Sequence, residues 1–334
     1  MRWLITGGCG FIGKSLIKKL MLDGKHSIRV LDNLSVGKMD SLADIAEVIS
    51  YQGDNLNAFE PMLDNMPSIE LIVADVRDSD VLINAAQNAE IIVHLAANTG
   101  VEPSVKKPRL DCEINVLGTF NSLEAARMHK CKRYVFASSG APLGEVEPPI
   151  HEEMAPHPVS PYGASKLAGE GYCSAYFRTY GVETVALRFG NVYGPGSGHK
   201  ESVVAKFIKQ ILDREELVIY GDGSQTRDFI YIDDLIGAII KAATQPDVGG
   251  EVFQIATNKE TTVQELLNVL LTVSANSDIK GISSSYSRAR QGDVMRNYSD
   301  TSKAGKLLAW QAETDLEKGL SQTLEWFQKE NQAH

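Results

Sequence analysis

The chain has 334 residues, of which 43% are hydrophobic and 23% charged, as is ordinary for a globular protein large enough for two domains. Lys and Arg total 33 against 43 Asp and Glu, so the net charge is −10, and no long basic run is present. This balance argues against a nucleic acid or a membrane surface as a partner. An anionic ligand would have to be held by local features such as helix N-termini and single arginines.

The four cysteines show no C-x-x-C pairing and no metal-ligand spacing, so we expect free buried thiols in a reducing compartment and no bound metal. They are Cys9, Cys112, Cys131 and Cys173. Strand-like sequence begins at Arg2, which leaves no room for a signal peptide, and no 18-residue apolar run occurs. We therefore expect a cytoplasmic protein.

The first strong motif follows a short apolar run at residues 2–6. It places Gly7, Gly10 and Gly13 directly before a helical pattern at residues 14–22. Strand, glycine turn and helix in this order form the context that a phosphate-binding loop needs. Gly7 would allow the tight turn, Gly10 the close approach of a pyrophosphate, and Gly13 the tight packing of the helix. A glycine triplet alone can be a simple turn, but these flanking elements predict a dinucleotide-binding unit.

The end of the second predicted strand, residues 27–31, indicates which dinucleotide binds. Asp32 follows the glycines by about 20 residues, where an acid hydrogen-bonds ribose hydroxyls and repels a 2′-phosphate. This position favours NAD over NADP. An Asp that only begins a turn is the alternative, because Asn33, Ser35 and Gly37 would complete such a turn.

Further apolar runs predict more strands of the same sheet, at residues 71–76, 91–97, 133–139 and 182–191. His94 lies inside one of these runs, so we expect a packed core histidine and not a base. Strands that alternate with helices indicate an α/β fold of the Rossmann type, a doubly wound parallel sheet covered on both faces. Residues 38–68 carry the weakest pattern of the first half.

The second half changes character and predicts a smaller mixed α/β domain. Helices are expected at 203–212, 232–241, 262–271 and 316–327, and strands at 217–220, 229–232 and 252–256. We therefore divide the chain into a dinucleotide-binding domain at 1–188 and a substrate domain at 189–334. The chain is expected to return to the first domain at about 229–256.

Tyr162 and Lys166 are four residues apart, which places them on one face of a helix that Ser160 would cap and Pro161 would begin. A phenol titrates near pH 10, and a positive charge close by lowers its pKa. Such a tyrosine can exchange a proton with a hydroxyl near neutral pH. By itself the spacing also suits two side chains that merely share a helix surface.

Together with Asp75-Val76, residues 95–97 and Ser138-Ser139, these motifs resemble those of the extended short-chain dehydrogenase/reductase family, nearest to its NAD-dependent nucleotide-sugar 4-epimerases. The resemblance runs from Met1 to about Trp310. It implies that Tyr162 is the acid/base, that Lys166 holds the nicotinamide ribose and lowers the tyrosine pKa, and that Ser139 bonds the sugar oxygen.

The resemblance also implies the remaining contacts. The residues expected to bind NAD are Gly7, Gly10, Phe11, Ile12, Gly13, Asp32, Asn33, Ser35, Gly37, Asp75, Val76, Leu95, Ala96, Ala97, Thr99, Asn115, Ala137, Tyr162, Lys166 and Phe189. Those expected to bind the nucleotide sugar are Ser139, Tyr162, Asn191, Val203, Tyr220, Arg227, Arg290 and Asn297. Arg227 and Arg290 match the diphosphate-binding arginines of the family, since guanidinium forks suit phosphate oxygens.

Some positions depart from the family pattern. Gly140-Ala141 replace the Asp-Glu pair of members that dehydrate the sugar, which disfavours dehydration. Leu143 stands where many epimerases have Tyr, and Thr99 where some have Lys. Asn297 matches a position that gates the sugar pocket, and its intermediate size hints at tolerance of an N-acetyl group.

We therefore expect a 4-epimerase of a UDP-hexose in carbohydrate metabolism, such as polysaccharide synthesis, with UDP-GlcNAc and UDP-GalNAc as further candidate substrates. The alternatives are a UDP-uronic acid 4-epimerase, another nucleotide-sugar oxidoreductase, or a dinucleotide-sensing scaffold without turnover. Helices expected at 115–128 and 162–180 resemble those that pair between subunits in the family, so we expect a homodimer.

Overall fold

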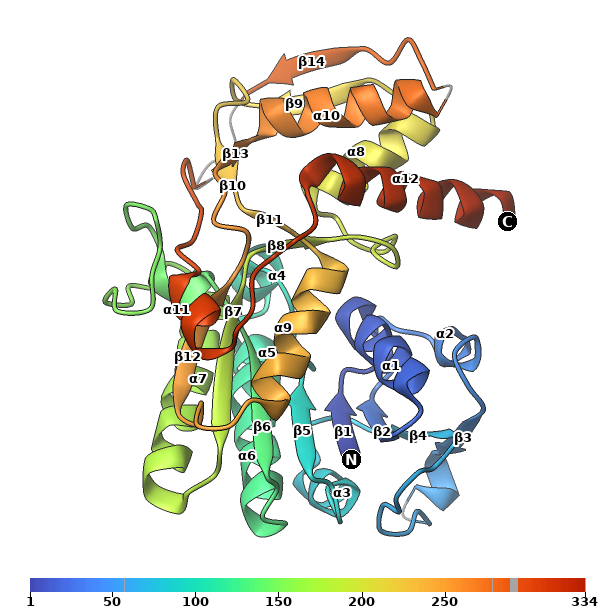
Figure 1. Cartoon of the computed structure of the whole chain (residues 1–334), viewed down its shortest axis with the longest axis vertical. Coiled ribbons are helices and arrows are strands. Elements are labelled where there is room, and N and C mark those ends of the chain that lie inside the picture. The colour runs from blue at the N-terminus through green and yellow to red at the C-terminus, as the bar shows by residue number, and fades with distance from the viewer. Residues whose placement is uncertain (57, 278, 289–293, 334) are drawn as a thin grey trace.

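The computed structural model describes residues 1–56, 58–277, 279–288 and 294–333 (Figure 1). Within these ranges a central sheet runs in the order β12-β7-β6-β5-β1-β2-β4-β3. Every neighbouring pair in it is parallel. Its strands are β1 (Arg2–Thr6), β2 (Ser27–Asp32), β3 (Val48–Tyr51), β4 (Ile69–Val73), β5 (Ile91–His94), β6 (Arg133–Ser139), β7 (Thr184–Phe189) and β12 (Glu251–Ile255). The predicted Rossmann-type sheet is confirmed.

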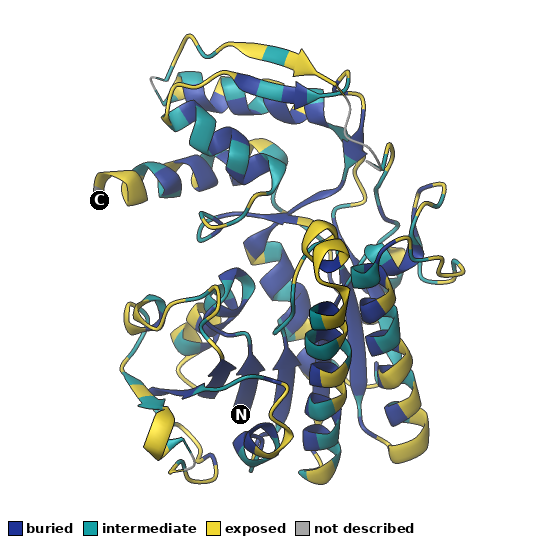
Figure 2. Cartoon of the chain, turned by 180° about the vertical axis from the view of Figure 1, so that it is seen from behind, coloured by how far each residue is buried: buried dark blue, intermediate teal, exposed yellow. Residues whose placement is uncertain are grey.

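Helices cover both faces of this sheet, because successive strand residues point to opposite sides. Trp3 and Ile5 belong to one buried cluster and Leu4 to the other. The first face carries α1 (Phe11–Asp23) and α9 (Ile232–Thr244), and the second carries α3 (Ser79–Ala85), α6 (Gly118–Met128) and α7 (Pro161–Tyr180). Figure 2 shows the inner strands of the sheet as a buried layer between these helices.

The second half of the chain contains α8 (Val203–Leu212), α10 (Val263–Asn276), α12 (Leu316–Ala333) and the parallel pair of β9 (Leu217–Tyr220) and β14 (Ser284–Ser287). Most of the second half's helices and its β9–β14 pair lie beyond the carboxyl ends of the strands, whereas α9, α11 (Ser302–Leu307) and β12 lie beside or within the sheet (Figure 1). β12 from this half pairs with β7, so the chain does return to the central sheet. The division into two domains at residue 188 stays a prediction.

Short elements join these parts. They are α2 (Asp40–Ala43), α4 (Val101–Lys106), α5 (Pro108–Cys112), α11 (Ser302–Leu307), β8 (Asn191–Tyr193), β10 (Thr226–Arg227), β11 (Phe229–Tyr231) and β13 (Thr261–Thr262). β8 pairs in parallel with β11, and β10 pairs in antiparallel fashion with β13. These two ribbons connect the sheet with the second half.

Two local structures differ from the sequence-based expectations. β3 lies in the stretch 38–68, for which no strand is predicted; it is an edge strand whose residues are half-buried or exposed, so it lacks an apolar run. The helix predicted from Asn115 is instead a π-helical segment, Glu113–Leu117, followed by α6. Gly118 begins α6 against Val76, where a Cβ would lie 2.6 Å from the valine Cγ2.

The predicted start of the helix that carries Tyr162 and Lys166 is confirmed. Ser160 caps α7, because its hydroxyl accepts a hydrogen bond from the Gly163 amide at 3.1 Å, and Pro161 is the first helical residue. Thr262 caps α10 in the same way through the Glu265 amide at 3.0 Å. The α7 cap sets where Tyr162 enters the first helical turn.

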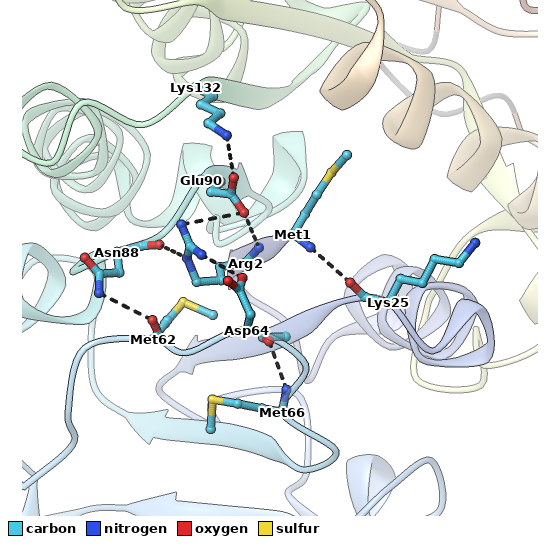
Figure 3. Close-up of polar contacts among 10 residues, drawn as sticks. Met1, Arg2, Lys25, Met62, Asp64, Met66, Asn88, Glu90 and Lys132 are labelled. Carbon is cyan, nitrogen blue, oxygen red and sulfur yellow. Dashed lines mark hydrogen bonds and ion pairs between the residues drawn. The ribbon is translucent and has the colours of Figure 1, made fainter.

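Polar contacts join the amino ends of the strands, at the edge of the sheet away from its carboxyl ends (Figure 3). The Arg2 guanidinium donates to the Asn88 carbonyl at 2.6 Å and pairs with Asp64 at 2.7 Å. Glu90, just before β5, accepts from the Arg2 amide at 3.0 Å and pairs with Lys132 at 2.6 Å. These contacts hold β1, β5 and β6 in register far from any of the predicted site residues.

All four cysteines are free. Three are buried, but Cys112 is exposed, because the short helix α5 ends there at the surface; the expectation of a buried thiol is wrong at this position. No helix in the described part of the chain combines the length and apolar character needed to cross a membrane.

Candidate active site

A cavity of about 720 Å³ opens at the carboxyl ends of the parallel strands. Segments that follow β1, β2, β4, β5, β6 and β7 all contribute to its wall, as expected where a doubly wound sheet binds its ligand. The predicted NAD residues that line it are Gly7, Gly10, Phe11, Ile12, Gly13, Asp32, Asn33, Ser35, Gly37, Asp75, Val76, Leu95, Ala96, Ala97, Thr99, Ala137, Tyr162, Lys166 and Phe189.

The glycine loop after β1 presents a helix N-terminus to this cavity. Gly7 has φ +70°, and a Cβ there would lie 2.7 Å from the Ala96 nitrogen, so only glycine fits. A Cβ on Gly13 would lie 2.5 Å from Gly8 Cα, so α1 packs directly on the turn. No side chain caps α1, and its first turn contains no acid. Its free amides therefore suit a diphosphate.

Asp32 is held at the end of β2 by two backbone amides. One carboxylate oxygen accepts from the Cys9 amide at 2.9 Å and the other from the Leu34 amide at 2.8 Å. Burial raises the pKa of Asp32. Each oxygen keeps a further lone pair at the cavity wall, so the carboxylate can accept bonds from ribose hydroxyls. The glycine cradle and this acid together fit NAD.

Asp75 stands beside this acid, after β4. Its carboxylate accepts from the Arg77 guanidinium and from the Asn33 amide, each at 2.9 Å. The Arg77 hydrogen bond holds the pKa of Asp75 at about 2. Asp75 therefore adds an ionised group to the cavity wall that Asp32 also lines.

Tyr162, Lys166 and Ser139 meet at the other end of the cavity. The Lys166 ammonium is buried and donates to the Ala137 carbonyl at 2.8 Å, and it lies 5.8 Å from the centroid of the Tyr162 ring. Ser139 ends β6 and hydrogen-bonds the Tyr162 side chain. A phenol, a hydroxyl and an ammonium thus face one space, as proton transfer to or from a sugar hydroxyl requires.

The expected lowering of the Tyr162 pKa by Lys166 is wrong for this structure. Burial raises the pKa of Tyr162 to about 12, against the lowering effect of the Ser139 hydrogen bond. Burial also lowers the pKa of Lys166 to about 8, although Asp111 and Glu170 oppose this. Desolvation is thus the main cause of both pKa shifts, and the Lys166 ammonium donates to the Ala137 carbonyl at 2.8 Å.

A buried ion pair beneath Lys166 was not predicted from the sequence. Glu170 accepts two hydrogen bonds from the Arg188 guanidinium, both at 2.8 Å, and one from the Ser138 hydroxyl at 2.6 Å. Glu170 and Arg188 are only 6% and 5% exposed. The available signal was spacing, because Glu170 follows Lys166 by one helical turn. The pair ties α7 to β6 and β7 directly below the site.

Asn115 does not line the cavity. Its side-chain carbonyl accepts from the Asn98 amide at 2.8 Å, and its amide group donates to Asp111 at 2.8 Å. Asp111 in turn accepts from the Ser165 hydroxyl at 2.6 Å. Asn115 therefore holds the segment after β5, which does line the cavity, and joins it to α7.

His94 is a core residue, as predicted. It is 1% exposed, and its ring nitrogens lie 2.8 Å and 3.2 Å from the hydroxyls of Thr6 and Thr119. Burial lowers the pKa of His94 to about 3, and the charge of Lys166 adds to this effect. The imidazole stays neutral and serves packing between strands and α6.

The predicted substrate residues separate into two groups. Asn191 and Val203 line the cavity with Ser139 and Tyr162, whereas Tyr220, Arg227 and Asn297 lie outside its wall. Arg290 lies outside the described residues. The Arg227 guanidinium donates to the Thr226 carbonyl at 2.7 Å and the Val294 carbonyl at 2.6 Å. Its expected contact with a diphosphate stays a prediction.

A sequence profile described as the NAD dependent epimerase/dehydratase family matches residues 3–256. The chain belongs to this family. A putative UDP-glucose 4-epimerase of Methanocaldococcus jannaschii is 36% identical over 336 residues, with 99% of each chain covered.

Two solved structures are similar over almost their whole length. The UDP-glucose 4-epimerase of Thermotoga maritima with UDP-glucose superposes with a TM-score of 0.85 at 33% identity, covering 99% of this chain and 100% of the other. The UDP-glucuronic acid 4-epimerase of Bacillus cereus, in complex with UDP-glucuronic acid and NAD, gives a TM-score of 0.84 at 27% identity, covering 98% and 99%. The chain is thus an NAD-dependent nucleotide-sugar 4-epimerase of the extended short-chain dehydrogenase/reductase type, as its motifs predict.

Proposed function

We propose that this epimerase interconverts UDP-glucose and UDP-galactose. The observation that carries the proposal is the meeting of Ser139, Tyr162 and Lys166 in one cavity with the glycine loop and Asp32. The similarity to UDP-glucose 4-epimerases supports the choice of sugar. The lack of acids after Ser139, where Gly140-Ala141 stand, argues against dehydration.

Bound NAD⁺ supplies a hydride acceptor for carbon 4 of the sugar and, once reduced, the donor that returns the hydride. Tyr162, as the phenolate, takes the proton of the 4-hydroxyl and, as the phenol, later gives it back; its side chain shares the space with Ser139. Ser139 steadies the sugar oxygen as it becomes a ketone. Lys166 binds the nicotinamide ribose through its ammonium.

Epimerisation also requires the sugar ring to turn over between the two hydride transfers. We propose that the nucleotide and diphosphate are held by Asn191, Val203, Tyr220, Arg227 and Arg290, which leaves the sugar free to rotate. Since Tyr220 and Arg227 lie outside the described cavity wall, their contacts require the second half to close on the substrate. Such closure is common for enzymes that bind ligands between two layers.

A second pair of substrates, UDP-GlcNAc and UDP-GalNAc, is favoured by the size of Asn297. This residue is half-buried, and its backbone amide donates to the Thr226 hydroxyl at 3.2 Å, next to Arg227. A UDP-uronic acid is the competing substrate, because a UDP-glucuronic acid 4-epimerase shares the fold. A role in polysaccharide synthesis and a cytoplasmic location stay predictions.

We further propose a homodimer formed through α6 and α7. Phe120, Tyr172 and Tyr180 on these helices are 37%, 39% and 56% exposed, and the centroids of the Phe120 and Tyr172 rings lie 5.7 Å apart. An aromatic surface of this kind is more typical of an interface than of a solvated face. Light scattering of the native chain tests it, and Tyr172→Glu is expected to yield monomers.

The deciding experiment incubates the purified protein, without added NAD, with UDP-glucose, UDP-GlcNAc or UDP-glucuronic acid, and follows the sugars by NMR. The galacto isomer of glucose is expected, because the cofactor is regenerated in each cycle and stays bound. Turnover of UDP-glucuronic acid alone would overturn the proposed sugar. Turnover that consumes added NAD would indicate a net oxidoreductase, and no turnover on any sugar would favour the scaffold alternative.

A further inference from the structure

A lysine from the second half of the chain reaches the cofactor end of the cavity. Lys200 lies in the loop between β8 and α8, and it lines the cavity together with Gly10, Phe11 and Ile12. Its ammonium lies 5.0 Å from the centroid of the Phe11 ring, and Phe11 is the first residue of α1. The charge therefore lies beside the helix N-terminus that faces the cavity.

This charge has no acidic partner among the residues that the structure describes. Burial lowers the pKa of Lys200, and no carboxylate among the described residues opposes that effect. The nearest acid in sequence, Glu201, is 85% exposed and pairs with Lys209 at 3.5 Å. A half-buried ammonium without a counter-ion is unfavourable unless a ligand supplies the negative charge.

The neighbours of Lys200 are also basic. Burial lowers the pKa of His199, and the charges of Lys200, Lys14 and Lys209 lower it further. A chain with a net charge of −10 thus gathers basic groups at the start of α1. Such a local positive field attracts an anion to that place.

The loop that carries Lys200 is fixed by contacts on several sides. The Lys200 amide donates to the Ser197 carbonyl at 2.9 Å, and the Lys209 ammonium donates to the Lys200 carbonyl at 3.2 Å. A Cβ on Gly196 would lie 3.4 Å from the Phe11 ring, and one on Gly198 would lie 3.3 Å from Trp326 of α12. The loop is therefore packed between α1, α8 and α12, which holds the lysine at the cavity wall.

We propose that Lys200 is a cofactor-binding residue, whose ammonium binds the diphosphate of NAD at the α1 N-terminus. The loop of residues 194–200 then retains the cofactor, so that NAD leaves only when this loop gives way. The proposal depends on NAD as the cofactor and not on which sugar is epimerised. The sugar-nucleotide diphosphate is the rival ligand, but the contact of Lys200 with Phe11 places it on the cofactor loop.

The test measures how fast NAD leaves the purified holoenzyme after large dilution, by assaying NAD in the filtrate at several salt concentrations. Lys200→Met is expected to release NAD about tenfold faster or more, as expected for the loss of a hydrogen bond to a charged group. Its release should depend less on salt than that of the native enzyme, because one ionic contact is gone. Lys200→Arg should retain most of the native behaviour.

Lys18→Met is the matched control, since Lys18 is an exposed lysine on α1 and is expected to leave NAD release unchanged. Equal thermal unfolding of the cofactor-free variants shows that the fold is intact. Unchanged NAD release in Lys200→Met would overturn the proposal. A raised KM for the UDP-sugar with unchanged NAD release would also overturn it, because Lys200 would then bind the substrate. An equal effect of Lys18→Met on NAD release would overturn it too, because any positive charge near α1 would then have the same effect.

Discussion

At the catalytic end of the cavity, Lys166, Glu170 and Arg188 are almost fully buried. Glu170 and Arg188 are joined by two hydrogen bonds of 2.8 Å, and the Lys166 ammonium donates to the Ala137 carbonyl at 2.8 Å. On the facing wall, Asn191 is exposed and Lys200 half-buried, and both lie on segments outside the central sheet. A buried charged network is costly to rearrange, whereas loops change position at little cost. The comparison indicates that the proposed catalytic groups stand on a buried framework of α7, β6 and β7, while Asn191 and Lys200 lie in β8 and in the loop that follows it.

The largest effect is expected at the catalytic end. Tyr162→Phe removes the proton-exchanging hydroxyl and should lower kcat by about 100- to 10,000-fold, with NAD retained. The measurement is NMR-monitored turnover of UDP-glucose together with the NAD content of the protein. Tyr172→Phe, a half-exposed tyrosine of the same helix, is the control and should turn over normally. An active Tyr162→Phe enzyme would contradict the assignment.

The buried ion pair should dominate the stability of this end. Glu170→Gln leaves the Arg188 charge buried without its partner, so the free energy of unfolding should fall by about 3–5 kcal/mol. Urea unfolding measures this. Arg109→Ala breaks a surface pair with Glu113 whose arginine is 92% exposed, and it should cost less than about 1 kcal/mol. A similar loss of unfolding free energy in both variants would contradict the larger contribution of the buried ion pair.

The buried ammonium predicts a pH-dependent stability. The pKa of Lys166 is about 8 in the folded protein and 10.5 as its ordinary value, so between these values the unfolded chain holds a proton that the folded protein has lost. The contribution of the neutral Lys166 amine to the free energy of unfolding is fully present above pH 10.5. It is lost as the pH falls through about 8. Relative to Lys166→Met, the cofactor-free native chain should gain about 3 kcal/mol on going from neutral pH to about pH 10.5. If the unfolding free energies of the two proteins changed equally with pH, the burial of the Lys166 ammonium would be contradicted.

A smaller and more selective effect is expected in the second half. Arg227→Ala should raise the KM for UDP-glucose about tenfold through loss of a charge-assisted bond, with kcat and NAD retention unchanged. Steady-state kinetics measure it. The exposed Arg178 of α7 supplies the control variant Arg178→Ala, with no expected change. A fall in kcat without a change in KM would place Arg227 at the chemical step.

The first half could be predicted in detail because local sequence encodes it. Gly7 needs a positive φ, Asp32 ends a strand, and Ser160 caps the helix of Tyr162 and Lys166; each is a short-range requirement. Parallel strands then bring these segments to one edge. The sequence pattern did not predict β3, because an edge strand needs no continuous apolar run. Arg290 lies outside the described residues, so its predicted role is untested.

By itself, then, the sequence determined the fold class and the cofactor and predicted the reacting side chains, because motif spacing and strand pattern act over a few residues. Only the tertiary structure decided how those side chains ionise. It buries Tyr162 and Lys166, which raises one pKa and lowers the other. It also sets Glu170 against Arg188 and brings Lys200 to Phe11 across the cavity. Desolvation and contacts between distant segments depend on how the whole chain packs, and no local pattern records them.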